Sequence, residues 1–220
     1  MLRGRVAHLA RVHAPPADVE HVDAILVSHA HRDHLDLPSL RRLPRTARVV
    51  VPQGLGRRVT RLGFRDVVEV DEGDEVDVVG VRVQTTHAEH APGRGAFARG
   101  ALPVGYLLRG SLDVYFAGDT DLFPEMASLA PGLDLALLPV SGWGPRVPAG
   151  HLDADRAARA LQLLAPRVCV PIHWGTFRPL YRPTPYDVDA GVAERFAARA
   201  HELAPAVEVR ILAPGGHTIV

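Results

Sequence analysis

The sequence predicts an α/β fold in which two β-sheets lie together and helices cover their outer faces. The first half of the chain shows mainly short strand patterns, whereas strands and helices alternate in the second half, which is typical of layered α/β domains. The chain has 220 residues, of which 47% are hydrophobic and 23% are charged, enough for one domain with a sizeable core. We therefore expect residues 1–220 to form a single domain.

Apolar or alternating runs bounded by glycine, proline or aspartate predict the strands. They are expected at 23–27, 47–51, 66–70, 76–79, 81–86, 103–108, 112–117, 133–140, 167–172 and 207–212. Helices are expected at 37–43, 55–62, 122–129, 153–164 and 189–203. Asp36 and Asp153 are the expected N-caps of two of these helices, and Gly80 is expected near the bend of a hairpin. Residues 1–12 fit either a short helix or an irregular segment.

Composition excludes several classes of function. Twenty-five basic residues, all of them arginine, balance 25 acidic residues, and the arginines are dispersed, so no nucleic-acid partner is expected. The single cysteine, Cys169, excludes a disulfide framework. No run is long and apolar enough to span a bilayer, and no signal-peptide pattern is present. We expect a cytoplasmic protein without a transmembrane segment.

The strongest functional signal is the stretch S-H-A-H-R-D-H, which directly follows the apolar run of the first strand. Its three histidines and one aspartate fall within six residues, and neutral imidazoles and carboxylates are ligands that zinc and similar divalent metals take. In an extended segment His29 and His31 would point the same way and could bind one ion, and Asp33 and His34 could bind a second. A polar loop with scattered histidines is the alternative, which such a dense cluster disfavours.

Further candidate ligands follow later strands, where loops commonly build sites. The stretch T-T-H-A-E-H offers His87 and His90, and alternation along the strand cannot decide between them. Asp119 stands in A-G-D-T-D, where a turn or helix-cap aspartate is the alternative, and Asp121 is expected to cap the next helix. His173 directly follows the strand expected at 167–172, and the alternative is a histidine whose hydrogen bonds are purely structural.

The spacing H-x-H-x-D-H resembles the signature motif of the metallo-β-lactamase superfamily, and the resemblance extends from about residue 2 to the end of the chain. It implies a four-layer αββα sandwich, the metallo-β-lactamase fold. Members usually begin with two or three strands before the segment that residues 2–5 resemble, so the fold is expected here without its first N-terminal strands. Part of the first sheet would then be exposed, and a homo-oligomer is left open.

The resemblance also implies a dinuclear ligand set. Many lactonase-like and phospholipase-D-like members carry Pro-Ala-x-His after this strand, and A-E-H matches its last three positions. This favours His90 and leaves His87 near the ligands or at the surface. The stretch G-D-T matches the place of the superfamily's metal-bridging aspartate, and P-I-H-W-G-T-F matches its final histidine. The implied set is His29, His31 and His90 on the first ion, Asp33, His34 and His173 on the second, and Asp119 bridging both.

The implied cofactors are two divalent metal ions, with zinc first and Mn²⁺ or Fe²⁺ as alternatives. Flavodiiron-type members carry glutamate at the second histidine of the motif, so His31 favours hydrolysis. The stretches G-H-L-D and I-H-W-G-T-F resemble the branch that contains ascorbate-6-phosphate lactonase and N-acyl-phosphatidylethanolamine phospholipase D. That branch implies that His151 contacts an oxyanion or a phosphate, and a helix-capping surface histidine is the alternative.

These observations predict a metal-dependent hydrolase that uses a metal-bridging hydroxide on a small-molecule ester, lactone or phosphodiester. Asp33 and His151 are the expected catalytic residues, with Asp33 taking part in proton transfer as well as metal binding. A tRNA-processing-type nuclease is one alternative, which the neutral charge disfavours. A degenerate binding module without turnover is another, which the complete ligand set disfavours.

Overall fold

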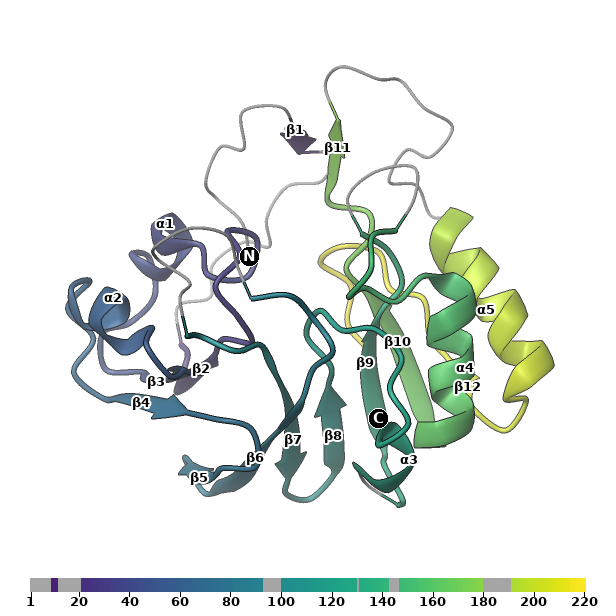
Figure 1. Cartoon of the computed structure of the whole chain (residues 1–220), viewed down its shortest axis with the longest axis horizontal. Helices are drawn as coiled ribbons and strands as arrows, with labels where there is room; N and C mark the ends of the chain where they lie inside the picture. The colour runs from purple at the N-terminus through teal and green to yellow at the C-terminus, as the bar shows by residue number, and fades with distance from the viewer. Residues whose placement is uncertain (1–8, 12–20, 93–99, 130, 143–146, 180–190) are drawn as a thin grey trace.

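The computed structural model describes residues 9–11, 21–92, 100–129, 131–142, 147–179 and 191–220 (Figure 1). Its strands are β1 (Leu9–Arg11), β2 (Ala24–Leu26), β3 (Arg48–Pro52), β4 (Val67–Val70), β5 (Glu75–Val78), β6 (Val81–His87), β7 (Val104–Arg109), β8 (Asp113–Phe116), β9 (Leu135–Pro139), β10 (Val168–Ile172), β11 (Phe177–Pro179) and β12 (Glu208–Val209). Its helices are α1 (Leu37–Leu40), α2 (Gly56–Thr60), α3 (Met126–Leu129), α4 (Ala154–Leu164) and α5 (Gly191–Leu203). None of these helices is both long and apolar enough to cross a membrane.

Two main sheets carry the fold. The smaller is parallel, with the order β2-β3-β4, and the larger has the order β12-β10-β9-β8-β7-β6-β5. Strands β5 to β8 pair antiparallel, whereas β8, β9, β10 and β12 pair parallel. A separate short pair joins β1 to β11 antiparallel.

The alternation along β3 shows how the layers pack. Val49 and Val51 pack on the face covered by α1 and α2, whereas Val50 packs with Val83 and Tyr106 of the larger sheet, and all three β3 valines are fully buried. On the far side of the larger sheet, a third core lies beneath α3, α4 and α5. Figure 1 shows α1 and α2 on one flank and α4 and α5 on the other. The four-layer αββα arrangement expected from the sequence is therefore confirmed.

Two predicted helix caps are confirmed, whereas several elements differ from their predictions. Asp36 and Asp153 cap α1 and α4 as expected, by accepting hydrogen bonds from the backbone N–H groups of Ser39 and Arg156. The helix expected at 122–129 is reduced to α3, because Asp121 does not cap it and instead contacts Arg156 and Gly150. The strand expected at 207–212 is reduced to β12, and residues 9–11, expected to be helical or irregular, form β1. The first two residues of the helix expected at 189–203 lie outside the described residues.

The β5–β6 hairpin contains a residue poorly suited to its conformation. Val79 and Gly80 are the two loop residues, with φ values of 56° and 80°, and Val79 is 61% exposed. A β-branched residue in the left-handed region destabilises the folded state by about 1–2 kcal/mol, whereas asparagine is favoured at such turns. We expect Val79→Asn to raise the melting temperature by about 2–4 °C in a thermal scan. Val81→Asn, in the adjacent extended strand, should lower it, and no gain for Val79→Asn would contradict this account.

Candidate metal centre

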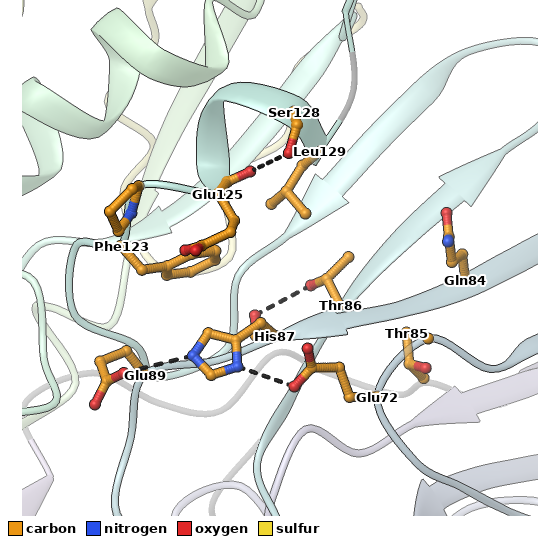
Figure 2. A pocket seen from close by; sticks show the side chains of 12 residues that line it. Glu72, Gln84, Thr85, Thr86, His87, Glu89, Phe123, Glu125, Ser128 and Leu129 are labelled. Atoms are coloured by element: carbon orange, nitrogen blue, oxygen red, sulfur yellow. Dashed lines mark hydrogen bonds and ion pairs between the residues drawn. The ribbon is translucent and has the colours of Figure 1, made fainter.

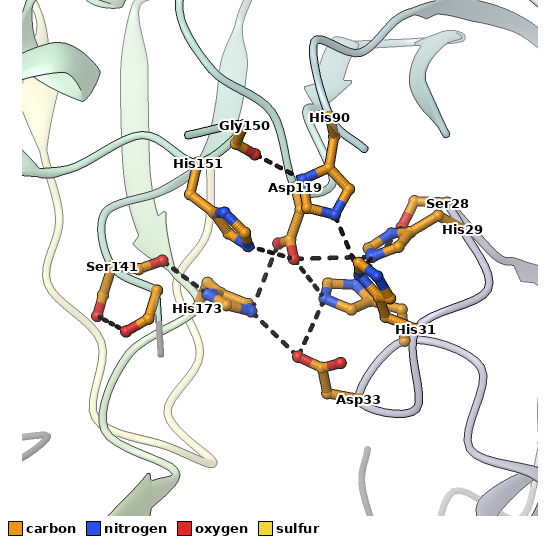
Figure 3. A network of polar contacts seen from close by, with 12 residues as sticks. Ser28, His29, His31, Asp33, His90, Asp119, Ser141, Gly150, His151 and His173 are labelled. Carbon is orange, nitrogen blue, oxygen red and sulfur yellow. Dashed lines mark hydrogen bonds and ion pairs between the residues drawn. The ribbon is translucent and has the colours of Figure 1, made fainter. Parts of the chain in front are cut away.

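The predicted ligands converge from loops that follow β2, β6, β8 and β10 (Figure 3). The first of these loops is fixed between the two sheets at its root. The backbone N–H of Val27 donates to the carbonyl of Val50 in β3 at 3.0 Å, and the Tyr106 hydroxyl of β7 donates to the carbonyl of Val27 at 2.8 Å. Both sheets therefore hold the residue immediately before the motif S-H-A-H-R-D-H.

The structure distinguishes the two histidines that sequence alternation leaves open. His90 Nε2 lies 3.0 Å from His31 Nδ1, which is itself 2.9 Å from His29 Nε2. His87 points away, with its ring nitrogens 2.9 Å from Glu72 and 3.5 Å from Glu89 (Figure 2). It lines a separate hollow of about 630 Å³ whose lining includes none of the predicted ligands. His90, and not His87, thus joins the histidines of the motif.

Among the residues that the structure describes, two groups of side chains could each hold a metal ion, and the ligand atoms within each group lie within 4.8 Å of one another. The first group is His29, His31, His90 and Asp119, and the second is Asp33, His34, Asp119 and His173. Asp119 belongs to both groups and is almost completely buried. All seven residues predicted as ligands are therefore brought together.

Backbone carbonyls fix two of the imidazole rings. His90 Nδ1 lies 2.6 Å from the carbonyl oxygen of Gly150, and His173 Nδ1 lies 2.8 Å from that of Ser141. A carbonyl only accepts, so Nδ1–H donates in both rings, which leaves Nε2 of each ring as the atom that would bind a metal. His173 also has a φ of 63°, a conformation that is uncommon for a residue other than glycine and that clusters at functional sites.

The chemistry of the donors fits a divalent metal. Two buried atoms, His34 Nε2 and Asp119 Oδ1, have only ion-pair contacts among the described residues and no hydrogen bond of good geometry, which is rare for buried polar atoms. His34 Nε2 lies 3.1 Å from Asp119 Oδ2, and Asp119 Oδ1 lies 3.4 Å from His173 Nε2. The separations of 2.9 and 3.0 Å between imidazole nitrogens of the first group are close to the value of about 3.3 Å between ligands of a tetrahedral zinc ion. A cation in each group would satisfy these atoms.

His151 lies beside both groups and is buried, not at the surface. Its Nε2 is 3.5 Å from Asp119 Oδ2, and its ring contacts that of His90 edge-on, with centroids 4.6 Å apart. Its Nδ1 is buried without a hydrogen-bond partner among the described residues.

The histidines of the first group are held neutral. Burial, with the neighbouring His34 as a further cause, lowers the pKa of His29 to about 2. Burial also lowers the pKa values of His31 and His90. Metal ions bind the neutral imidazole, so this group is ready to bind a cation without losing protons.

The second group is charged in the metal-free protein. Burial opposes the charge of His34, but Asp119 and Asp33 outweigh burial and raise its pKa to about 9. Burial likewise opposes the charge of His173, and the same carboxylates raise its pKa. Burial opposes ionisation of Asp33 and Asp119, but neighbouring histidines hold both pKa values well below the usual range. The protonated His34 imidazole thus offsets part of the carboxylate charge that would otherwise face a metal.

These opposite shifts predict a stability optimum near pH 6.5 for the metal-free protein. Below 6.5 the unfolded chain binds protons that the folded His29 resists, so stability falls as the pH falls. Above 6.5 the folded His34 retains a proton that the unfolded chain releases, so stability falls as the pH rises toward about 9. Thermal scans of chelator-treated protein from pH about 5 to about 9 would test this. Bound zinc should remove the fall above pH 6.5, and a flat metal-free profile would contradict the assignment.

Two glycines, whose role was not predicted from the sequence, allow the loops of the site to approach one another closely. Gly118 has a φ of 63°, and a Cβ there would lie 2.8 Å from the Cβ of Ser28, so it lets the Asp119 loop lie against the motif. Gly150 has a φ of 81°, and a Cβ there would lie 3.2 Å from His90 Nδ1. Their positions directly before Asp119 and His151 are the only signal of this role in the sequence.

Comparisons with known proteins agree with this geometry. A family model described as "Beta-lactamase superfamily domain" matches residues 2–174. A UPF0173 metal-dependent hydrolase of Rubrobacter xylanophilus is 34% identical over 204 residues, which cover 88% of this chain and 77% of that protein. Another, of Pyrococcus horikoshii, is 33% identical over 173 residues, covering 76% of this chain and 73% of that protein.

Among solved structures, Igni18, a novel metallo hydrolase from the hyperthermophilic archaeon Ignicoccus hospitalis, is similar with a TM-score of 0.65 and 26% identity. The match covers 90% of this chain and 78% of that one. The expected metallo-β-lactamase fold is therefore confirmed, and the protein is a metal-dependent hydrolase. The chain belongs to the metallo-β-lactamase superfamily and, within it, to the family of UPF0173 metal-dependent hydrolases.

Proposed function

We propose that the chain is a dinuclear zinc hydrolase of a small ester, lactone or phosphodiester. The observation that carries the proposal is that two four-residue ligand groups share the buried carboxylate of Asp119. A carboxylate has two oxygens and can contact one ion with each. Four imidazoles or carboxylates around each ion suit zinc, and Mn²⁺ or Fe²⁺ are the alternatives.

The residues of the site have separate roles in this proposal. His29, His31 and His90 would hold one ion, Asp33, His34 and His173 the other, and Asp119 both. Bound cations would supply a water of lowered pKa and positive charge beside the substrate oxygen that becomes negative.

In this proposal Asp33 accepts a proton as well as binding an ion. Its Oδ2 lies 3.4 Å from His173 Nε2 and 3.5 Å from His34 Nε2. His151, whose Nε2 lies 3.5 Å from Asp119 Oδ2, can donate from a ring nitrogen to the oxygen that gains charge in the transition state.

The sequence around His151 and His173 supports a finer assignment. The stretches G-H-L-D and I-H-W-G-T-F resemble the branch of ascorbate-6-phosphate lactonase and N-acyl-phosphatidylethanolamine phospholipase D. The His151 ring lies beside the carboxylate that the two ligand groups share, next to the place where a substrate oxygen would meet the ions. We therefore place lactones and phosphodiesters first among the substrates to be tested.

Metal content and hydrolysis measured together test the proposed function. Elemental analysis of protein purified without added metal should find about two ions per chain, and zinc should be the main one. The same protein should hydrolyse members of a panel of 4-nitrophenyl esters, lactones and bis(4-nitrophenyl) phosphate, and lose this activity on chelation. A protein that binds no metal after reconstitution, or that binds two ions and hydrolyses nothing on the panel, would contradict the proposal.

Changing His151 to alanine should slow hydrolysis without removing metal. Loss of one donor to a developing oxyanion costs about 100- to 1,000-fold in kcat. His151 belongs to neither ligand group, so the metal content should stay at the wild-type value. Steady-state kinetics and elemental analysis on the same preparation would test this, and His201→Ala on α5 serves as a control. Unchanged kcat, or loss of an ion, would show that His151 has another role.

A further inference from the structure

Outside the ligand groups, an ion pair holds the segment that supports His90 and carries His151. Arg156 Nη1 of α4 contacts both carboxylate oxygens of Asp121, at 2.7 and 2.6 Å. The Asp121 carboxylate also accepts a hydrogen bond from the backbone N–H of Gly150 at 3.2 Å. Both charged side chains are largely shielded from solvent, with exposed fractions of 18% for Asp121 and 28% for Arg156.

Asp121 reaches the His90 segment from two sides. Its own backbone N–H donates to the carbonyl of Glu89 at 2.9 Å, directly before His90. Its side chain holds Gly150, whose carbonyl accepts the Nδ1–H of His90 at 2.6 Å. The carboxylate therefore ties together the backbone that carries His90 and the backbone that orients its ring.

The conformation of Gly150 makes both contacts available at once. With a φ of 81°, its N–H faces Asp121. Its carbonyl faces His90 (Figure 3). His151 follows directly, and Asp153, two residues later, caps α4 and accepts a second contact from Arg156 at 3.2 Å. One ion pair thus sets the place of two imidazoles beside the metal centre.

We propose that Asp121 and Arg156 form a clasp that positions His90 and His151 against the metal ions. The inference rests on the proposed function, because the clasp acts through residues assigned there to metal binding and catalysis. Asp121 and Arg156 are positioning residues, since neither belongs to the ligand groups. Loss of the clasp releases Gly150, and His90 then loses the carbonyl that fixes its tautomer and ring direction.

Metal affinity measures the first consequence. Removing a partner that orients a metal ligand commonly weakens metal binding by about 10- to 100-fold. We expect a loss of that size for Arg156→Met in a zinc titration against a chelator of known affinity. Arg156→Lys should recover part of the loss, because one nitrogen of Arg156 makes both contacts to Asp121 and a single ammonium can replace it.

Arg199→Met is the matched control. Arg199 of α5 pairs with Asp155 of α4 at 2.7 Å, so the substitution also removes an arginine pair from α4. No hydrogen bond of Arg199 to Gly150 or His90 occurs in the described structure, and wild-type metal affinity is expected. An equal loss in Arg199→Met and Arg156→Met would overturn the proposal, because it would show only a general effect of weakening α4.

Ring N–H signals in the metal-free protein give a second readout that needs neither metal nor activity. The His90 Nδ1–H should give a slowly exchanging proton signal, which can be assigned by its absence in His90→Gln. We expect this signal to be lost in Arg156→Met, whereas that of His173 Nδ1–H, bonded to Ser141, stays as an internal control. A retained His90 signal would overturn the clasp. Because this result is independent of bound metal, it separates failure of the clasp from failure of the proposed function.

Discussion

Replacing Asp119 with alanine is expected to remove both metal ions and to lower kcat/KM by more than about 1,000-fold, since several kcal/mol of transition-state stabilisation would be lost. Asp119 is the residue that both ligand groups share, so its loss affects both ions at once. Its removal also takes away one of the two carboxylates that raise the pKa values of His34 and His173. Elemental analysis and kinetics on the purified variant would test this.

Asp155→Ala is the control for this experiment. Its carboxylate is exposed on α4 and pairs with Arg199, so two ions and full activity are expected. Asp119→Asn adds a second comparison, because asparagine offers one oxygen to the ions where aspartate offers two. Retention of two ions by Asp119→Ala would show that the carboxylate does not bridge, and the dinuclear assignment would have to be abandoned.

We expect His90→Ala to remove a metal ligand, whereas His87→Ala, three positions earlier, should leave the metal ligands intact. His90→Ala should lose the ion of the first group and at least about 1,000-fold in kcat/KM, because His90 Nε2 lies 3.0 Å from His31 Nδ1. His87→Ala should keep both ions, because in the described part of the chain its ring nitrogens contact Glu72 and Glu89, which lie outside both ligand groups. Metal content per chain and kcat/KM are the measurements.

Each variant is the control for the other, because both remove one imidazole from the same stretch of chain. Circular dichroism and a thermal scan would show that both fold. Loss of metal in His87→Ala with retention in His90→Ala would reverse the assignment of the first group. Equal retention in both would mean that His29, His31 and Asp119 are sufficient for that ion.

The strand ends and the cluster of ligands were predictable because they depend on local sequence. Apolar runs give β3 and β10 within a residue or two, and the residue types of the motif identify its chemistry. The choice between His87 and His90 was not determined by alternation, because β6 extends through His87 and the chain turns immediately afterwards. The backbone N–H of His90 donates to the carbonyl of Ala88 in that turn, which places the ring on the side of the motif.

Contacts between distant parts of the chain account for what the sequence could not show. Asp121 looks like a helix cap because it follows a glycine-containing turn and precedes a helical pattern, but Arg156, 35 residues away, engages its side chain. Gly118 and Gly150 look like ordinary turn glycines until the neighbours of their absent Cβ atoms are known. Such roles depend on packing between loops, which local propensity does not contain.

Each of the two ligand groups contains residues from loops of both sheets, so the proposed ions would also stabilise the fold. In each group some ligands follow β2 of the smaller sheet, and the others follow strands of the larger sheet. An ion in either group would therefore cross-link the two halves of the molecule, between positions as distant in sequence as Asp33 and His173. A link that closes so long a loop lowers the entropy of the unfolded chain, as a disulfide does. This protein has one cysteine and can form no internal disulfide, so the metal centre would fasten its sheets as well as perform its chemistry.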